Sequence, residues 1–252
     1  MKYIKINESN LISFYDTKWN DAVFGYKTNE ISEIKFDSIE NGIKLLNMFD
    51  NECNSNDVKY SAIRVNSNSN DTKFILEKSD YYNIETSIKV ESNIKKINEN
   101  SFFEKFKFSL EAADIKSLPF IKNISDNEFK HGRFFEDSNI DLELAKKRNR
   151  NWIDDLYKSS NLLVGKTNGE IFSFMFYSLN NCDVNFQLGG VSSKYSHLAY
   201  PFWYKIIMKL KNDDIKNINA IISANNISII NLYSHFGFRF SNSFIGYRKF
   251  RK

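Results

Sequence analysis

The residues most open to a chemical role follow an alternating apolar stretch at 184–191, which predicts a strand. The loop Val191–Tyr200 comes next and leads into a helix predicted from about Pro201 to Lys211. Unpaired backbone amides and the dipole at the start of a helix favour a bound phosphate group. The segment is therefore a candidate anion-binding loop, although most loops between a strand and a helix bind nothing.

The elements around this loop decide whether it can hold a ligand. The strand at 184–191, the helix at 201–211 and a strand predicted at 218–223 form one crossover connection, so the two strands should run parallel. In sheets with parallel strands, ligands bind where a strand ends and the chain enters the next helix. The loop Val191–Tyr200 is predicted to lie at such a place.

A hairpin and a final helix flank this crossover. Residues Leu162–Lys166 and Ile171–Ser178 alternate in polarity on either side of a turn that contains Asn168-Gly169, a dipeptide that strongly favours a hairpin. Residues Ile227–Phe236 are expected to be helical and to stop at Gly237, because glycine readily adopts the left-handed backbone that ends many helices. The C-terminal part of the chain is therefore expected to combine antiparallel and parallel strands with helices.

Shorter patterns describe the rest of the chain. Alternating runs predict strands, whereas a capping residue or apolar residues along one helical face predict helices. Strands are expected at Ile31–Phe36, Tyr60–Val65, Ile84–Val90 and Phe106–Leu110, and helices at Ser38–Phe49, Asp71–Lys78, Asp114–Lys122 and Leu144–Tyr157. The polar segment 91–100 indicates a boundary, so we expect an N-terminal α/β domain over residues 1–98 and a second domain over 99–252.

The composition argues against several functional classes. The net charge is +4 without a concentrated basic stripe, which fits an anionic small molecule and argues against nucleic acid. The two cysteines, Cys53 and Cys182, and the three histidines lack metal-ligand spacing, so no metal site is expected. We see no apolar leader and no apolar run approaching ~18 residues, so we expect a cytoplasmic protein that does not span a membrane.

The end of the chain carries a spaced set of residues. Asn226 follows a predicted strand, Leu232-Tyr233 lie about two turns later, and Gly237-Phe238 end the helix. Together with the upstream hairpin and a strand ending in Gly189-Gly190-Val191, this order resembles the GNAT superfamily of N-acetyltransferases, from about Phe106 to the C-terminus. The resemblance implies an α/β fold with a GNAT-type mixed, mostly antiparallel sheet, a central parallel strand pair that splays, flanking helices, and a smaller, partly GNAT-like N-terminal α/β domain.

Two other segments carry a narrower resemblance. Trp19 opens the sequence Trp-Asn-Asp-Ala-Val-Phe-Gly-Tyr, and Gly132-Arg133-Phe134 precede Asp137, Ala145 and Asn151-Trp152-Ile153. Both segments are similar to those of the dTDP-fucosamine acetyltransferase-like group. Members of that group have an N-terminal α/β half and acetylate the amino group of a nucleotide-linked amino-deoxy sugar.

The resemblance implies roles for individual residues. Tyr233 is the expected general acid, which protonates the leaving thiolate, and Asn226 is expected to hydrogen-bond the pantetheine arm of acetyl-CoA, the acetyl donor. The structural alternatives are a core tyrosine and the N-cap of the last helix. The expected cofactor-binding residues are Gly190, Val191, Ser193, Lys194, Ser196, His197, Leu198, Ala199, Tyr200, Asn226 and Tyr233.

The expected substrate-binding residues are Arg133, Phe134 and Gln187. A guanidinium group can bind a diphosphate through two parallel hydrogen bonds, and the alternative for Arg133 is an ion pair with Glu136 or Asp137. The strand at 184–191 contains no carboxylate, so the general base is unassigned and removal of the amine proton through water is expected.

The expected pyrophosphate loop departs from the superfamily pattern. That pattern usually reads Arg/Gln-x-x-Gly-x-Gly/Ala, whereas this chain has Ser196, Ala199 and Pro201 at the three defining positions. Glycine lets the backbone close around the phosphates, and proline removes an amide donor, although it is well tolerated in the first turn of a helix. Three outcomes stay open: the loop binds coenzyme A with fewer donors, holds it weakly, or has lost the site.

Taken with the resemblance, these features predict an enzyme that transfers acetyl from acetyl-CoA to an amino group by direct attack, without a covalent enzyme intermediate. The expected substrate is a small-molecule amine, first of all a nucleotide amino-sugar. No nucleic acid or membrane partner is expected, and an exposed sheet edge is compatible with a homodimer. Two alternatives stay open: a GNAT enzyme for another amine (an aminoglycoside, polyamine or peptide), and a degenerate GNAT-fold binding module without catalysis.

Overall fold

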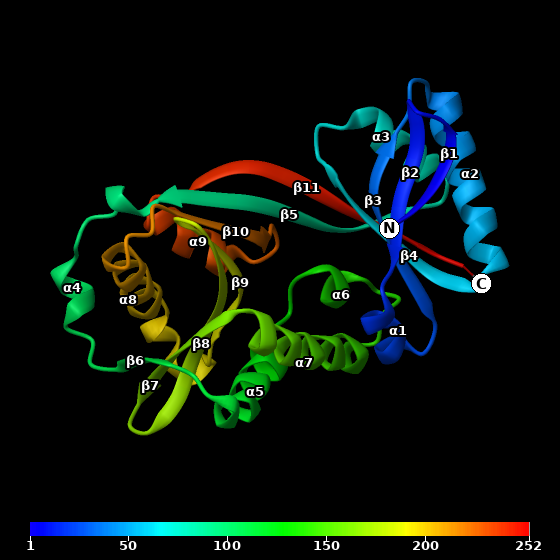
Figure 1. The fold of residues 1–252 in the computed structure, drawn as a ribbon. Coiled ribbons are helices and arrows are strands. Elements are labelled where there is room, and N and C mark those ends of the chain that lie inside the picture. The colour runs from blue at the N-terminus through cyan, green and yellow to red at the C-terminus, as the bar shows by residue number, and fades with distance from the viewer. Residues whose placement is uncertain (252) are drawn as a thin grey trace. The chain divides into compact units, whose positions relative to one another are not determined.

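The computed structural model of the protein describes residues 1–251 and is shown in Figure 1. The chain forms two compact units. The N-terminal unit contains residues 1–87, 132–139 and 243–251, and the C-terminal unit contains Ile88–His131 and Ile140–Asn242. The N-terminal unit is therefore built from three segments of the chain. The sequence instead predicts one boundary, at residue 98, and that boundary stays a prediction.

The N-terminal unit is a sheet with helices. Its strands are β1 (Lys2–Asn7), β2 (Asn10–Asp16), β3 (Lys27–Lys35), β4 (Val58–Asn66) and the parts of β5 (Tyr82–Asn93) and β11 (Arg239–Phe250) that belong to this unit. Strand β2 pairs with β1 and β3 antiparallel, β3 with β4 parallel, and β4 with β11 antiparallel. The helices are α1 (Lys18–Phe24), α2 (Ile39–Ser55), α3 (Asn70–Lys78) and α6 (Arg133–Glu136).

Helix α2 carries most of the packing in this unit. The side chain of Ser38 accepts a hydrogen bond from the backbone amide of Asn41 at 3.3 Å and so caps the first turn. One face of the helix buries Leu45, Leu46 and Phe49 completely against the sheet. Burying each of these side chains contributes roughly 1.5–3 kcal/mol to stability. This packing holds α2 against the sheet directly after the end of β3.

The C-terminal unit contains a longer sheet. Its strand order is β5, β10 (Asn217–Ser223), β9 (Asp183–Val191), β8 (Glu170–Asn180), β7 (Asn161–Thr167) and β6 (Ser109–Ala112). Strands β9 and β10 are parallel, and the pairs β8–β9, β7–β8 and β6–β7 are antiparallel. Its α-helices are α4 (Ser101–Glu104), α5 (Leu118–Glu128), α7 (Leu142–Ser159), α8 (Ala199–Asn212) and α9 (Ile227–His235). Short 3₁₀ turns lie at η1 (Ile94–Lys96), η2 (Ile115–Ser117) and η3 (Ser193–Leu198).

Two apolar cores cover the two faces of this sheet. Helices α5 and α7 bury Ile121 and Ile153 against Phe174 and Phe176 of β8. The larger core lies on the other face of the sheet, where α8 and α9 cover apolar side chains of β9 and β10. The C-terminal unit therefore has helices on both faces of a mixed sheet, as Figure 1 also shows.

The structure confirms the predicted fold class: a mixed, mostly antiparallel sheet with parallel pairs, flanked by helices. It also confirms the hairpin around Asn168-Gly169 and the parallel crossover through α8. Gly237 lies after α9 with a φ of 69°, the left-handed conformation expected at the end of that helix.

Two predicted elements were misplaced. The strand expected at Phe106–Leu110 begins only at Ser109, because Phe106 and Phe108 pack against the core and produce the same alternation. The helix expected at Asp114–Lys122 begins as a 3₁₀ turn and continues as α5 to Glu128, with a proline in its first turn, where the missing amide costs little. Strands β1, β2 and β11 and helix α1 were not predicted.

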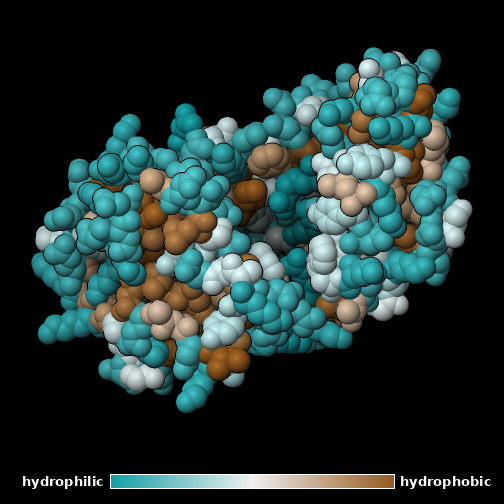
Figure 2. Space-filling model, in the orientation of Figure 1, coloured by the Kyte–Doolittle hydropathy of each residue, from teal (hydrophilic) through white to brown (hydrophobic). Residues whose placement is uncertain are grey.

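The surface is mostly polar. Figure 2 shows hydrophilic side chains over most of the visible face, with separate apolar groups among them. Exposed large apolar side chains include those of Phe102, Phe120 and Ile227. Within residues 1–251, no helix combines the length and the apolar character that crossing a membrane would take.

Candidate functional site

The parallel strands β9 and β10 diverge before they end. Their pairing runs from Asp183 opposite Asn217 to Phe186 opposite Ala220. Strand β9 then continues to Val191 and β10 to Ser223, with no further pairing between them in the described part of the chain. The two strands therefore open at their carboxyl ends, as expected of a splayed pair.

A bulge at Gln187 accompanies this divergence. On the other side of β9, Phe186 lies opposite Tyr177 and Leu188 lies opposite Phe176, so Gln187 is the extra residue between them. A bulge bends a strand and increases its twist. Gln187 is half-buried, and its Oε1 atom has no hydrogen-bond partner in the part of the chain that the structure describes. The side-chain carbonyl oxygen of Gln187 is thus unpaired at the point where β9 separates from β10.

Two glycines follow the bulge and let other groups come close to β9. A Cβ atom on Gly189 would lie 2.6 Å from the Cε atom of Met175, and one on Gly190 would lie 2.7 Å from the ring of Phe129. Real Cβ atoms are not found at such distances, so a side chain at either position would displace its neighbours. This end of β9 is therefore packed tightly on both faces of the sheet, against Met175 of the larger core on one side and against Phe129 at the end of α5 on the other.

Tyr233 lies on α9 in the larger core of the C-terminal unit. Its side chain is 2% exposed, and its ring centroid is 4.7 Å from that of Phe238. Burial raises the pKa of Tyr233 to about 12, and the neighbouring side chain of Trp203 opposes part of this shift. The phenol is therefore protonated at neutral pH, a state in which it can donate a proton. Asn226 caps the same helix, because its Oδ1 atom accepts the backbone amide of Ile229 at 3.1 Å.

The loop after β9 uses several of its polar groups internally. The amide of Ser193 donates to Oε1 of Glu128 at 2.8 Å, and the amide of Tyr195 donates to the carbonyl oxygen of Ser192 at 2.8 Å. Lys194 forms an ion pair with Glu170 at 2.8 Å. These contacts leave fewer free donors for a diphosphate than an open loop would offer.

The start of α8 is also partly occupied. The amide of Ala199 donates to the carbonyl oxygen of Ser196, Leu198 is buried in the core, and Pro201 has no amide hydrogen. The ring of Tyr200 lies 5.1 Å from that of His235 on α9. Among the expected cofactor-binding residues, Gly190 and Val191 lie on β9 and Tyr233 on α9, whereas those between Ser193 and Leu198 form a 3₁₀ turn and Ala199 and Tyr200 begin α8.

Arg133 and Phe134 belong to the N-terminal unit. The guanidinium of Arg133 contacts Glu30 at 3.1 Å and Glu85 at 3.4 Å. Burial lowers the pKa of Arg133, but the two carboxylates outweigh it and the net shift is upward. The ring of Phe134 packs against Phe24, with centroids 5.4 Å apart.

These partners of Arg133 differ from the two carboxylates named in the sequence-based alternative. Glu136 instead accepts the amide of Gly132 at 2.8 Å, and Asp137 accepts hydrogen bonds from Arg248. Glu30 and Glu85 are 103 and 48 residues away from Arg133 in the chain, so no local pattern could have identified them. Within residues 1–251 there is also no group of three or more His, Cys, Asp or Glu side chains suited to a metal ion.

Comparison with known proteins gives a fold but no close relative. No protein-family model matches the chain, and no curated protein matches it either. Among solved structures, a conserved protein of unknown function from Staphylococcus epidermidis has a TM-score of 0.65 at 10% identity, covering 100% of this chain and 94% of that one. A GCN5-related N-acetyltransferase from Sphaerobacter thermophilus has a TM-score of 0.67 at 9% identity, covering 96% of this chain and 76% of that one.

A third solved structure is a tandem GNAT protein from the clavulanic acid biosynthesis pathway. Its TM-score is 0.61 at 8% identity, and the match covers 88% of this chain and 75% of that one. Identities this low establish the architecture only. The chain thus has the fold of the GCN5-related N-acetyltransferases, in agreement with the resemblance at the end of its sequence.

Proposed function

We propose that the protein transfers the acetyl group of acetyl-CoA to the amino group of a small molecule, with the reacting centre in the C-terminal unit. The observation that carries this proposal is the divergence of β9 and β10 at the Gln187 bulge, with Tyr233 on the helix that follows β10. Two parallel strands that separate at their carboxyl ends leave unpaired backbone groups, which suit the amide-bearing pantetheine arm.

In the proposed reaction, the neutral amine attacks the thioester carbon directly. The carbon–nitrogen bond forms, the carbon–sulfur bond breaks, the nitrogen loses a proton to water, and the sulfur gains one. A backbone amide near Val191 stabilises the developing oxyanion or binds the arm. Tyr233 supplies the proton to sulfur, Gln187 accepts a hydrogen bond from a bound amide or amine, and Asn226 binds the arm in addition to capping α9.

For the acceptor, we propose a nucleotide-linked amino-deoxy sugar. The support is the similarity of the Arg133-Phe134 segment to the sugar acetyltransferase group. Glu30 and Glu85 already bind the guanidinium of Arg133, so a substrate diphosphate would have to share it with them. A panel of nucleotide amino-sugars, aminoglycosides, polyamines and peptide amines, with free thiol release as the readout, would identify the acceptor class.

The direct test of the mechanism is Tyr233→Phe. Losing a general acid lowers turnover by about 10²–10⁴-fold, whereas binding of acetyl-CoA should change little. The matched control is Tyr177→Phe, which removes the hydroxyl of another tyrosine buried in the same core and should leave turnover near wild type. Equal turnover of Tyr233→Phe and the wild type would refute the assignment.

A second candidate function is a binding module without catalysis. It is favoured by the state of the loop after β9, where Glu128 holds the amide of Ser193 and Glu170 neutralises Lys194. Calorimetry with acetyl-CoA separates the two functions. A saturable signal supports the enzyme, and its absence supports the binding module.

A further inference from the structure

The chain path in the C-terminal unit has a counterpart in the N-terminal unit. One run is β3–α2–β4–α3–β5, and the other is β9–α8–β10–α9–β11. In both runs the first two strands are parallel and are joined by a long helix. Helices α3 and α9 each contain 9 residues, and β5 and β11 each contain 12. The fold therefore contains an internal repeat.

The ends of α3 and α9 match in detail. The second residue after each helix has a left-handed backbone, with φ of 59° at Asp80 and 69° at Gly237. The amide of the next residue donates to the carbonyl oxygen of Leu76 in the first repeat, at 2.9 Å, and of Tyr233 in the second, at 3.0 Å. Leu76 is thus the counterpart of Tyr233.

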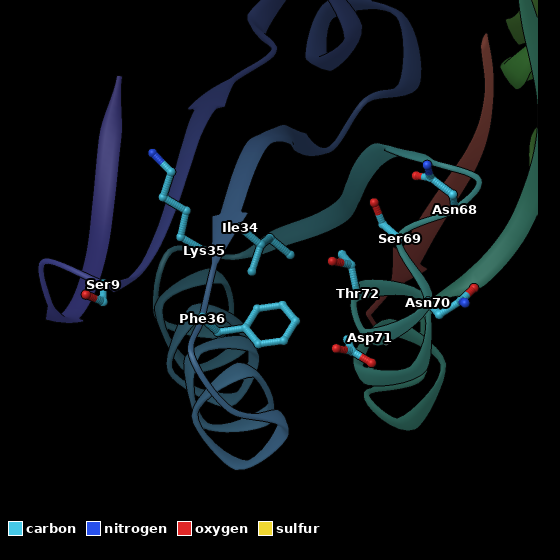
Figure 3. Close-up of a pocket in the computed structure, with 9 residues that line it drawn as sticks. All are labelled: Ser9, Ile34, Lys35, Phe36, Asn68, Ser69, Asn70, Asp71 and Thr72. Atoms are coloured by element: carbon cyan, nitrogen blue, oxygen red, sulfur yellow. The ribbon is translucent and has the colours of Figure 1, made fainter.

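The parallel strands of the first repeat also diverge. Their pairing runs from Lys27 to Ile31 on β3, after which β3 continues to Lys35 and β4 to Asn66. A cleft of about 740 Å³ lies at these carboxyl ends, between the end of β3 and the first turn of α3 (Figure 3). Its position in the first repeat corresponds to that of the splayed β9 and β10 in the second.

We propose that this cleft is a second, non-catalytic ligand site that binds a neutral mono- or disaccharide. Leu76 is a fully buried apolar side chain with no proton to give, so the general acid proposed for the second repeat has no equivalent at this position. The helix that follows β3 does not suit a phosphate either. Its first turn is already capped by Ser38, and the carboxylate of Asp37 lies next to it.

The lining of the cleft suits a sugar. Ile34 and the half-buried ring of Phe36 form an apolar surface, and Figure 3 shows that ring projecting toward the first turn of α3. The opposite side presents the hydroxyls of Ser69 and Thr72 and the carboxylate of Asp71. A sugar ring has an apolar face of C–H groups and a rim of hydroxyls that both donate and accept. Those hydroxyls match the Ser, Thr and Asp groups, and the ring of Phe36 matches the C–H face.

The nearby charges agree with a neutral ligand. The lining contains one cation, Lys35, which also pairs with the exposed Glu33 at 3.1 Å, and one carboxylate, Asp71, so it has no excess of positive charge for a phosphate. A phosphorylated ligand such as coenzyme A would meet the carboxylate of Asp71 in the lining. The proposal concerns binding in the N-terminal unit and goes beyond acetyl transfer, so it stands or falls independently of that function.

The test is a titration of the full-length ¹⁵N-labelled protein, followed through its backbone amide signals. The probes are N-acetylglucosamine, galactose, mannose and maltose, with coenzyme A as a separate arm. We expect at least one saccharide to shift the amides of residues 34–36 and 68–72 with saturation. Asp71→Ala should weaken that binding about tenfold, the effect of losing one hydrogen bond to a charged group.

The matched control is Asp80→Asn, which removes a negative charge at the other end of α3 and should leave the affinity unchanged. Phe36→Leu is a second variant that keeps an apolar side chain and loses the ring face. It should also weaken binding, and its own spectrum reports whether it is folded. The proposal is overturned if no saccharide shifts these amides, if only coenzyme A does, or if Asp80→Asn weakens binding as much as Asp71→Ala.

Discussion

Asp137 is expected to anchor the segment 132–139 in the N-terminal unit. Its carboxylate is 2% exposed and accepts hydrogen bonds from Nε of Arg248 at 3.2 Å, the hydroxyl of Tyr60 at 3.3 Å and the amide of Asn139 at 3.0 Å. Arg248 is itself 7% exposed. Removing one partner of a buried ion pair leaves the other uncompensated and costs about 3–5 kcal/mol. Asp137→Ala should therefore lower the free energy of unfolding by about that amount.

Chemical denaturation of the variant and the wild type measures this difference. A loss of about 3–5 kcal/mol corresponds to a melting temperature lower by about 6–20 °C for a protein of this size. The control is Asp16→Ala, which breaks the exposed ion pair with Lys2 and should cost less than about 1 kcal/mol. If Asp137→Ala is no less stable than Asp16→Ala, the carboxylate does not hold this segment and the reasoning fails.

Three further outcomes follow from single side chains. Glu128→Ala removes the carboxylate that now accepts the amide of Ser193, so calorimetry should show severalfold tighter binding of coenzyme A; unchanged binding would contradict this. The pKa of Tyr233 is about 12 in the folded state and ~10 when unfolded, so stability falls as pH rises through that range. In urea titrations, the free energy of unfolding of the wild type should therefore fall by about 3 kcal/mol more over this pH range than that of Tyr233→Phe, and an identical pH profile of the two proteins would argue against the shift. A thiol reagent should modify exposed Cys182 quickly and buried Cys53 only after denaturation, and rapid labelling of both would show that the core is open.

The elements with strong local signals were the ones that the sequence predicted well. The hairpin was predicted from Asn168-Gly169, and the end of α9 from Gly237, because both positions need a left-handed backbone that few residues adopt. Strand β1 lies at the edge of the sheet, and its alternation is short: only Ile4 and Ile6 pack against the core, and both are just half-buried. Strand β11 was missed for a different reason: it contributes to both units, and its burial changes along its length.

The bulge at Gln187 shows why the site geometry could not be read from alternation. Val184, Phe186 and Leu188 alternate regularly in sequence, which predicts that all three face the same core. In the structure the extra residue reverses the alternation, so that Val184 and Phe186 pack with α8 whereas Leu188 packs with α5 and α7. A bulge depends on the register with β8, which a single strand sequence does not contain.

The internal repeat explains how one fold could divide its tasks. The two runs share the parallel pair, the divergence and the helix end. They differ where chemistry would be required. Leu76 stands where the second repeat has Tyr233, and a capped helix start follows β3 where a longer loop follows β9.

Neither unit is built from one repeat alone, because β4 pairs with β11 and β10 neighbours β5. A fragment cut near residue 98 would therefore leave β4 without the strand that covers its edge, and exposed strand edges favour aggregation. Because each repeat supplies the strand that completes the other's sheet, the non-catalytic repeat would be retained for folding even if its cleft bound nothing, so only the titration of that cleft bears on its function.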